Sequence, residues 1–207
     1  MCPFNMVKVA LCGKMASGKT TIAENFISDY SYFQRVSLAD AVKRFARFMF
    51  DIPEGHKDRV AFQKMGDGAR RFLYEDIWID VLLNEVESEE AHGNMEHFII
   101  DDVRYKNEVI KLKENGWLVI KIDIDDDLQI ERLKNAYPEN WQTHVDARNH
   151  ASEAEMDDIP DRLFDLVINA EDSKSPFRVI EDFASAAEIT TDDNTPPYHR
   201  RLQYLEN

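Results

Sequence analysis

The chain alternates between short apolar runs and longer segments with helical spacing. Turn-forming residues bound five apolar runs of strand-like length, at 6–12, 32–37, 97–103, 117–124 and 164–170. This alternation is typical of an α/β domain in which helices cover both faces of a mostly parallel sheet. The pattern therefore predicts a five-stranded parallel sheet flanked by helices.

Helical spacing fills the segments between these runs. It predicts helices in five places, at 20–30, 39–50, 58–86, 105–115 and 128–135. The third of them is longer than a crossover between parallel strands needs, so we expect a separate helical lobe there.

One domain is expected for a chain of 207 residues. Within it we expect a core over about 5–57, 96–135 and 160–188, a substrate-binding lobe over about 58–95, a lid over about 136–158 and a tail over 189–207. The lid segment is polar with little apolar periodicity, which predicts a mobile flap.

Composition narrows the classes of partner. The chain has 40 acidic and 25 basic residues and a net charge of −15, so broad attraction to a nucleic-acid backbone is not expected. An anionic ligand must instead be held by a local cluster of donors. Two cysteines, no membrane-spanning apolar run and no signal-peptide features predict a cytoplasmic protein.

A glycine-punctuated loop joins the first predicted strand to the first predicted helix. Gly13, Gly18, Lys19 and Thr20 match the phosphate-binding pattern G-x-x-x-x-G-K-[ST], in the strand–loop–helix context that it requires. The glycines let the backbone N–H groups curl toward phosphate oxygens, and the helix adds the positive end of its dipole. Lys19 would reach the β- and γ-phosphates of ATP, and the Thr20 hydroxyl would ligate Mg²⁺.

The whole loop is expected to bind ATP, through Gly13, Lys14, Ala16, Ser17, Gly18, Lys19, Thr20 and Thr21. Lys14 either touches a phosphate or is solvated.

The helix expected after the second strand carries a charged face beside an apolar one. Asp40, Lys43, Arg44 and Arg47 follow helical spacing. At the carboxyl end of a parallel strand such a face borders the ligand crevice, so we expect Asp40 and Lys43 to contact an acceptor substrate. A solvated helix face explains Arg44 and Arg47 equally well.

Further along, Gln63, Arg70, Tyr74 and Trp78 are spaced so that a continuous helix would place them on one stripe. An amide can read a base edge, a guanidinium can fork onto a phosphate, and an aromatic ring can stack on a base. We therefore expect Gln63 and Arg70 at a nucleotide. Tyr74 and Trp78 are also typical of core packing, which is favoured for Trp78.

The third predicted strand ends in two aspartates and an arginine. Burying Asp101 or Asp102 without a cation would be costly. In P-loop enzymes an acidic residue here usually orients a water on Mg²⁺ or accepts the acceptor's proton. Arg104 would point across the cleft toward a phosphate.

Cationic and polar residues on and beside the lid segment are the last candidates, namely Arg132, Arg148, His150 and Glu153. Phosphoryl transfer needs positive charge over the γ-phosphate and water kept out, and an arginine-bearing lid does both. For Arg132 the alternative is an ordinary exposed helix position. His150 has no partner at metal-ligand spacing, so a hydrogen-bonding role in the lid is expected.

Together these stretches resemble the P-loop nucleoside monophosphate kinases, and most closely the deoxynucleoside monophosphate kinases known from bacteriophages. The matching stretches, in chain order over about residues 7–170, are "GKMASGKTT", "SLADAVK", "FQKMGDGARR" with the later "IW", "IIDDVRYKNE", "RNHASE" and "VINA". The P-loop is specific only to a large superfamily, whereas the succession of "SLAD", "DDVR" and "HASE" is more restrictive.

The resemblance implies a P-loop NTPase fold and transfer of the ATP γ-phosphate to a deoxynucleoside monophosphate. It implies ATP and Mg²⁺ as cofactors, with Asp102 near the metal and Asn169 beside the donor adenine. The implied catalytic residues are Lys19, Asp102, Arg104, Arg132 and Arg148. The candidates for binding the acceptor are Asp40, Lys43, Gln63, Arg70, Arg71, Tyr74, Trp78, Arg104, His150 and Glu153, and either Arg70 or Arg71 faces the substrate.

The resemblance also implies a homodimer and, for a phage protein, the host cytoplasm. Two other functions compete with the leading one. Dephospho-coenzyme A and phosphomevalonate kinases are similar in loop, strand-end aspartate and lid, although the amide and aromatic residues of 58–80 suit a base better than an isoprenoid chain. A non-catalytic NTP-binding switch is the other, and the arginine clusters count against it. The accepted base and the discrimination against ribose stay open.

Overall fold

The structure is a computed structural model that describes residues 7–29, 33–92, 97–146 and 151–171. Its sheet consists of β1 (Lys8–Cys12), β2 (Phe33–Val36), β3 (His97–Val103), β4 (Leu118–Asp123) and β5 (Leu166–Asn169). The strands are all parallel and lie in the order β2-β3-β1-β4-β5. The five-stranded parallel sheet predicted from the apolar runs is therefore confirmed.

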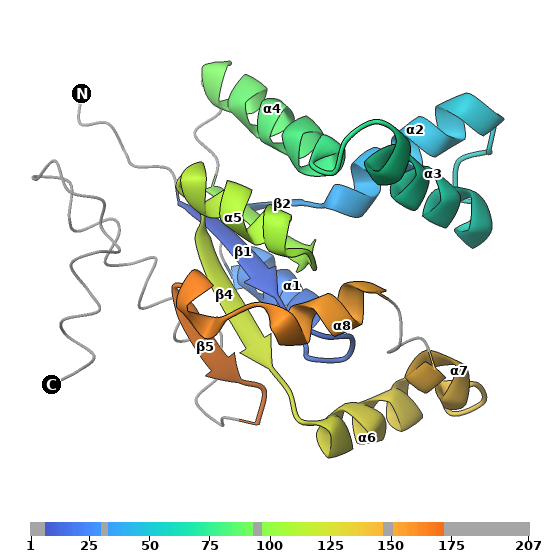
Figure 1. The fold of residues 1–207 in the computed structure, drawn as a ribbon, viewed down its shortest axis with the longest axis vertical. Coiled ribbons are helices and arrows are strands. Elements are labelled where there is room, and N and C mark those ends of the chain that lie inside the picture. The colour runs from blue at the N-terminus through green and yellow to red at the C-terminus, as the bar shows by residue number, and fades with distance from the viewer. Residues whose placement is uncertain (1–6, 30–32, 93–96, 147–150, 172–207) are drawn as a thin grey trace, which may run out of the picture.

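Helices cover both faces of the sheet, as the alternation of elements predicts. On one face, Ile22 and Phe26 of α1 (Lys19–Asp29) pack against alternate residues of the central strands. On the other face, Val109 and Leu112 of α5 (Lys106–Glu114) belong to a cluster that includes buried Trp117. Figure 1 shows α5 in front of the central strands and α1 behind them. These two apolar layers fix the strand ends that carry the site.

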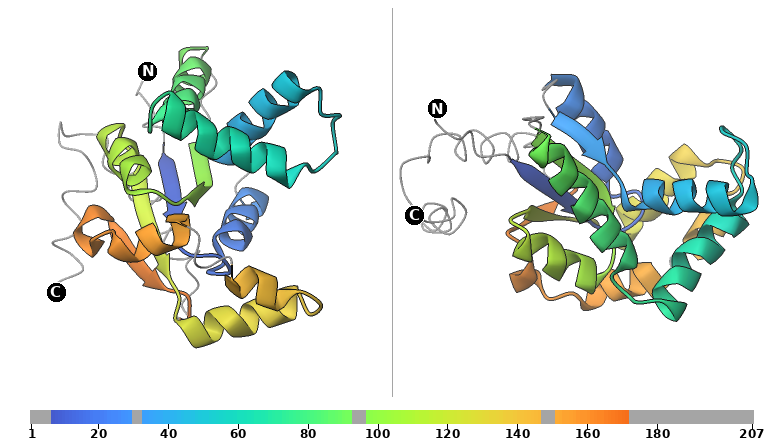
Figure 2. Two further views of the ribbon diagram at one scale, coloured as in Figure 1. Left: turned by 45° about the vertical axis from the view of Figure 1, so that its right-hand side comes forward. Right: turned by 90° about the horizontal axis from the view of Figure 1, so that it is seen from above.

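Three helices between β2 and β3 form a lobe beside the sheet: α2 (Leu38–Phe50), α3 (Arg59–Phe72) and α4 (Ile77–Ala91). Figure 2 shows α2 and α3 projecting beyond the sheet. The prediction of one helical stretch over 58–86 is wrong, because the chain turns at 73–76. The turn lets α3 and α4 both pack against α2, which one straight helix could not do.

The segment after β4 contains α6 (Asp126–Ala136), α7 (Trp141–Asp146), α8 (Ala151–Asp158) and the short helix η2 (Asp161–Leu163). The helix predicted from residue 128 begins two residues earlier, because the Asp125 carboxylate caps it by accepting the Leu128 N–H at 2.9 Å. Met156 of α8 is buried in the core, so this part of the expected flap packs on the domain. None of the described helices is long and apolar enough to cross a membrane.

Candidate functional site

The loop between β1 and α1 has the curled backbone that its sequence predicts. Gly13 has φ +146°, and a Cβ there would lie 2.5 Å from the carbonyl oxygen of Ile122 on β4. Only glycine fits that contact. Buried Lys19 crosses the loop, and its Nζ donates to the carbonyls of Gly13 at 2.6 Å and Lys14 at 2.7 Å. The loop is thus held around the amine that would meet a phosphate.

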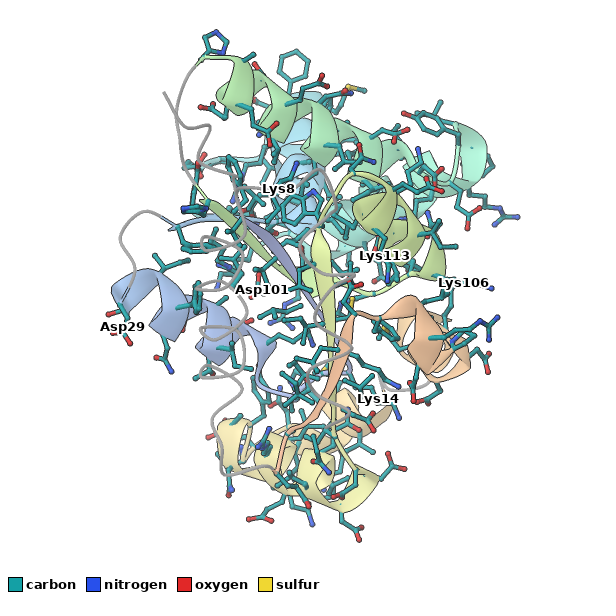
Figure 3. All side chains as sticks on the ribbon, turned by 90° about the vertical axis from the view of Figure 1, so that its left-hand side faces the viewer. Lys8, Lys14, Asp29, Asp101, Lys106 and Lys113 are labelled. Atoms are coloured by element: carbon teal, nitrogen blue, oxygen red, sulfur yellow. The ribbon has the colours of Figure 1, made fainter. Side chains whose placement is uncertain are left out.

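A cavity of about 720 Å³ lies beside this loop. Its lining includes residues 15–21, together with Arg35, Asp101, Asp102, Arg104, Arg132 and Ala170. Of the predicted ATP-binding residues, Gly13, Lys14 and Asn169 do not line it. The Lys14 amine forms an ion pair with Asp157 of α8 at 2.8 Å, so the choice between phosphate contact and a solvated amine stays a prediction. Figure 3 labels Lys14.

The two aspartates at the end of β3 have different surroundings. The Asp101 carboxylate is 1% exposed and is forked by Arg35, at 2.9 and 3.0 Å. This hydrogen-bonded pair raises the pKa of Arg35. Asp101 is therefore committed to an ion pair with β2, although it also lines the loop cavity.

Asp102 is partly exposed and faces the site. Its carboxylate accepts hydrogen bonds from the Ser37 hydroxyl at 2.8 Å and from the backbone N–H groups of Leu38 at 3.1 Å and Ala39 at 2.8 Å. These groups lie at the start of α2, where the helix dipole favours negative charge. Burial nevertheless raises the pKa of Asp102. The position agrees with the site residue predicted from the strand end.

A second cavity, of about 450 Å³, extends from the same point into the lobe. The two cavities share five lining residues, which are Met15, Ala39, Lys43, Asp102 and Arg104. They therefore meet at the ends of β2 and β3, where one ligand on the loop and another in the lobe would bring their near ends together. This arrangement is what transfer of a group between two substrates requires.

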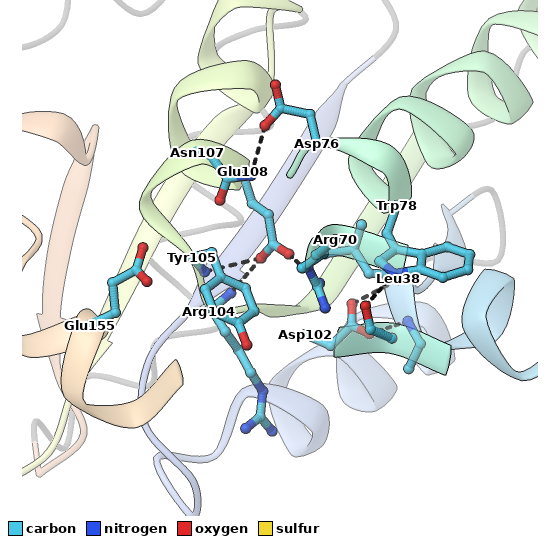
Figure 4. A network of polar contacts seen from close by, with 12 residues as sticks. Leu38, Arg70, Asp76, Trp78, Asp102, Arg104, Tyr105, Asn107, Glu108 and Glu155 are labelled. Carbon is cyan, nitrogen blue, oxygen red and sulfur yellow. Dashed lines mark hydrogen bonds and ion pairs between the residues drawn. The ribbon is translucent and has the colours of Figure 1, made fainter. Parts of the chain in front are cut away.

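The far part of the second cavity is lined by α3 and the start of α5. Phe62, Gln63 and Arg70 come from α3, and Tyr105 and Glu108 from the segment after β3. The Arg70 guanidinium bonds the Glu108 carboxylate at 2.8 Å and stacks over the Tyr105 ring at 4.6 Å, as Figure 4 shows. Gln63 and Arg70 thus line one cavity as expected, whereas its aromatic rings are Phe62 and Tyr105 and not the expected Tyr74 and Trp78.

Sequence reasoning missed Glu108. It is 2% exposed, and burial raises its pKa. A glutamate four residues after Arg104, in the first turn of a predicted helix, is usually a helix-capping residue. Capping contacts do occur here, but no pattern in the sequence indicates that the same carboxylate borders the second cavity.

Arg71, Tyr74 and Trp78 lie outside this cavity, which for Trp78 confirms the favoured core packing. Arg71 is exposed over the Phe72 ring, at 5.4 Å, and only Arg70 lines the cavity. Tyr74 is half exposed and lies in the turn after α3, outside this cavity. Trp78 is buried in the core, and its Nε1–H donates to the Gly66 carbonyl at 3.0 Å. The helix break at 73–76 removes the stripe that these residues would have shared.

The charged face of α2 is only partly directed at the site. Lys43 lines both cavities and bonds the exposed Asp40 carboxylate at 2.7 Å, whereas Asp40 lines neither. Arg44 pairs with Glu85. Arg47 pairs with Glu54 at 3.5 Å. Lys43 is therefore the member of this face that reaches the candidate site.

Arg132 lies on α6 against the phosphate-binding loop. Its guanidinium donates to the carbonyls of Ala16 at 3.2 Å, Ser17 at 3.1 Å and Ala170 at 3.0 Å. Arg132 lines the loop cavity, which agrees with the expected position near the phosphates. Its bonds to these carbonyls hold the guanidinium against the loop. Ala170, rather than the exposed Asn169, lines the cavity.

The remaining lid candidates are not placed by the structure. Arg148 and His150 lie outside the described residues. Glu153 belongs to α8, but its side chain is also outside the described part of the chain. Their roles stay predictions.

The residues around the loop fit an ATP–magnesium complex in their donor chemistry. Thr20 and Asp102 offer hydroxyl and carboxylate oxygens to the same cavity, and Mg²⁺ prefers oxygen ligands shared with substrate phosphates. Backbone N–H groups of the loop and the Lys19 amine offer donors to the phosphates.

No protein-family profile matches the sequence, and no curated protein matches it either. Among solved structures, TT1252 from Thermus thermophilus is 15% identical with a TM-score of 0.52, covering 89% of this chain and 98% of its own. An uncharacterized protein from Eubacterium ventriosum is 13% identical with a TM-score of 0.50, covering 87% and 99%. Shikimate kinase from Bacteroides thetaiotaomicron is 14% identical, covering 98% and 99%, but its TM-score of 0.44 supports no argument.

These likenesses concern the fold alone. Together with the strand order and the loop between β1 and α1, they show a P-loop NTPase fold. The predicted fold class is thus confirmed.

Proposed function

We propose that this protein is an ATP-dependent kinase that phosphorylates a deoxynucleoside monophosphate to the diphosphate. The observation that carries the proposal is the junction of the two cavities at Lys43, Asp102 and Arg104, between the phosphate-binding loop and the lobe. One cavity has the donors that a triphosphate needs, and the other has room and chemistry for a second substrate.

The transfer would be a direct displacement. An oxygen of the acceptor phosphate attacks the γ-phosphorus, the bond from that phosphorus to the β–γ bridging oxygen breaks, and ADP leaves with that oxygen. Lys19 would exchange its two backbone carbonyl partners for β- and γ-phosphate oxygens. Mg²⁺, held by Thr20 and near Asp102, would neutralise phosphate charge when bound.

Arg104 and Lys43 would hold the acceptor phosphate, because both line the junction. Asp102 would accept a proton from a singly protonated acceptor phosphate or orient a water at the metal. No covalent intermediate is needed, since positioning and electrostatic stabilisation supply most of the catalysis in phosphoryl transfer.

The class of acceptor follows from the far part of the second cavity and from the family resemblance. Phe62 and Tyr105 offer ring faces, and Gln63 and Arg70 offer groups that bond base edges. A volume of about 450 Å³ lies in the range of sites for small ligands. The preference for 2′-deoxyribose rests on the resemblance alone.

The first test is turnover with single acceptors. The purified protein is mixed with ATP and Mg²⁺, and ADP formation is followed with dAMP, dGMP, dCMP, dTMP or a ribonucleotide counterpart added singly. We expect acceptor-dependent ADP formation with one or more deoxynucleotides. Lys19→Ala should lose at least about a hundredfold in rate with its circular dichroism unchanged.

Absence of acceptor-dependent turnover in all these mixtures would refute the proposal. Dephospho-coenzyme A and phosphomevalonate would then be tested as acceptors. ATP binding without any acceptor-dependent turnover would favour a nucleotide-binding switch.

A further inference from the structure

A buried ion pair joins the lobe to the core inside the acceptor cavity. Arg70 comes from α3 and Glu108 from the first turn of α5, and their bond is 2.8 Å long. The Glu108 side chain is 2% exposed, whereas 21% of the Arg70 side chain is exposed. The carboxylate is thus the buried partner, and the guanidinium is the partner that ligands can reach.

The two carboxylate oxygens of Glu108 have separate partners. Oε1 accepts from Arg70, while Oε2 accepts from the backbone N–H groups of Arg104 at 2.9 Å and Tyr105 at 3.0 Å. Glu108 is thereby anchored to the backbone that follows β3. It holds the Arg70 guanidinium from one side, and the Tyr105 ring supports its face at 4.6 Å. Figure 4 shows this arrangement.

The position of Arg70 in the cavity indicates which part of a nucleotide it would meet. Arg104 and Lys43 line both cavities, whereas Arg70 and Glu108 line only the acceptor cavity. A nucleotide whose phosphate lies at the junction would extend its sugar and base into this far part.

We propose that Glu108 is a positioning residue of the acceptor site, holding Arg70 so that its free N–H groups bind the base of the acceptor nucleotide. This inference rests on the proposed function. Glu108 lines only the acceptor cavity, away from the loop cavity, so it would act through Arg70 and not on the reacting phosphates. A charged partner keeps the guanidinium in one place, so its hydrogen bonds to a base cost little ordering on binding.

A double-mutant cycle tests whether Glu108 acts through Arg70. Glu108→Gln, Arg70→Gln and the double variant are compared with the wild type, using the deoxynucleotide that the wild type phosphorylates fastest. We expect each single variant to raise the acceptor KM about tenfold or more, with kcat and the ATP KM changed less than about threefold. In the Arg70→Gln background, Glu108→Gln should have little additional effect.

A ligand that has the sugar phosphate but no base distinguishes an effect on phosphate binding from an effect on base binding. Binding of 2′-deoxyribose 5-phosphate, measured by calorimetry, should be equal in wild type and Glu108→Gln, because Arg104 and Lys43 remain. Binding of the deoxynucleotide should be weaker in the variant. A merely structural defect in the variant would weaken both ligands.

Two matched controls exist in the chain. Glu155→Gln removes a carboxylate that accepts the Lys106 N–H at 2.9 Å, also at the start of α5 but outside the cavity. Arg71→Gln removes the neighbouring guanidinium, which is exposed outside the cavity. Neither control should change the acceptor KM. If Glu108→Gln does not fold, Arg70→Lys is used in its place. This variant should also bind the deoxynucleotide more weakly than the wild type does and bind 2′-deoxyribose 5-phosphate equally well.

Additive effects in the cycle, or equal weakening of both ligands, would overturn the role given to Glu108. So would an unchanged acceptor KM in Glu108→Gln. Failure of the proposed function has a different signature, since the wild type itself would then phosphorylate no deoxynucleotide, and this inference would fall with it.

Discussion

At the scale of single residues, neighbours decide what two adjacent carboxylates do. Asp101 and Asp102 follow one another at the end of β3, yet Arg35 forks the first and the start of α2 binds the second. A carboxylate that forms a bidentate ion pair with an arginine has its oxygens occupied, so it serves mainly to stabilise the fold. Asp102 has hydroxyl and N–H partners instead, so it keeps its charge available to the cleft, which gives it the role in the proposed transfer.

Protonation of Asp102 should lower kcat at acidic pH. Burial raises its pKa above the ordinary 3.8, so as the pH falls it gains its proton at a higher pH than an exposed aspartate does. Since the ionised form is the active one, kcat should fall as the pH drops through this raised pKa. The measurement is kcat at saturating substrates from about pH 4, near the ordinary pKa of an aspartate, up to about pH 8.

Asp102→Asn provides the control for this fall in kcat. It should lower kcat by about a hundredfold, and the wild-type to variant ratio at each pH cancels the ionisation of the substrate's own phosphate. A ratio that stays constant across the pH range would show that Asp102 is not the titrating group.

At the scale of elements, the break between α3 and α4 shapes the cavity that we propose for the acceptor. Trp78 lies in the first turn of α4 and donates to the Gly66 carbonyl of α3, so this hydrogen bond links the two helices. Phe45 of α2 also contacts its ring, with centroids 5.9 Å apart. The position of α3 sets the positions of Phe62, Gln63 and Arg70. The packing of one buried indole is therefore coupled to the acceptor cavity.

Trp78→Phe should weaken both stability and acceptor binding. It removes the hydrogen bond to Gly66 and part of the buried ring, which should lower the free energy of unfolding by about 1–3 kcal/mol. The acceptor KM should rise while the ATP KM stays unchanged, because the P-loop does not depend on α3. Urea unfolding and steady-state kinetics measure the two effects.

Trp141→Phe is the matched control. Trp141 lies on α7, where the Lys134 ammonium sits 4.8 Å from the centre of its ring, remote in the chain from α3. Its replacement should leave the acceptor KM unchanged. A rise in the ATP KM of Trp78→Phe, without a rise for the acceptor, would contradict the coupling.

At the scale of the whole molecule, the two cavities that the proposed function assigns to ATP and the acceptor meet within a strongly acidic protein. The net charge of −15 repels nucleotides at long range, so local donors must overcome it. Lys19, Lys43 and Arg104 concentrate near the junction and supply that local charge. The junction is consequently the place where both substrates' phosphates are best tolerated.

A bisubstrate analogue tests whether the two cavities form one continuous cleft. Adenosine joined to the accepted deoxynucleoside by five phosphates should occupy both cavities at once and bind at least about tenfold more tightly than ATP. The same nucleosides joined by three phosphates form the control, since this bridge is too short to span the junction. Equal affinities of the two compounds, measured by calorimetry, would count against a continuous cleft.

Much of the fold and of the ATP side could be predicted from sequence. Apolar runs and helical spacing predict the strands and most helices, because burial on a sheet or helix face leaves a local period. The loop from Gly13 to Thr20 is likewise local, since its donors are successive backbone groups and neighbouring side chains. The patterns that reveal these features are local in the sequence, although the strands themselves pair with distant residues.

The acceptor side depended on tertiary structure. The turn at 73–76 separates Trp78 from Arg70, and the choice between Arg70 and Arg71 follows from how α3 packs on α2. Glu108 meets Arg70 from 38 residues away. The sequence by itself thus determined a parallel α/β core with a phosphate-binding loop. Only the tertiary structure decided which side chains face the second cavity, because long-range packing sets their directions.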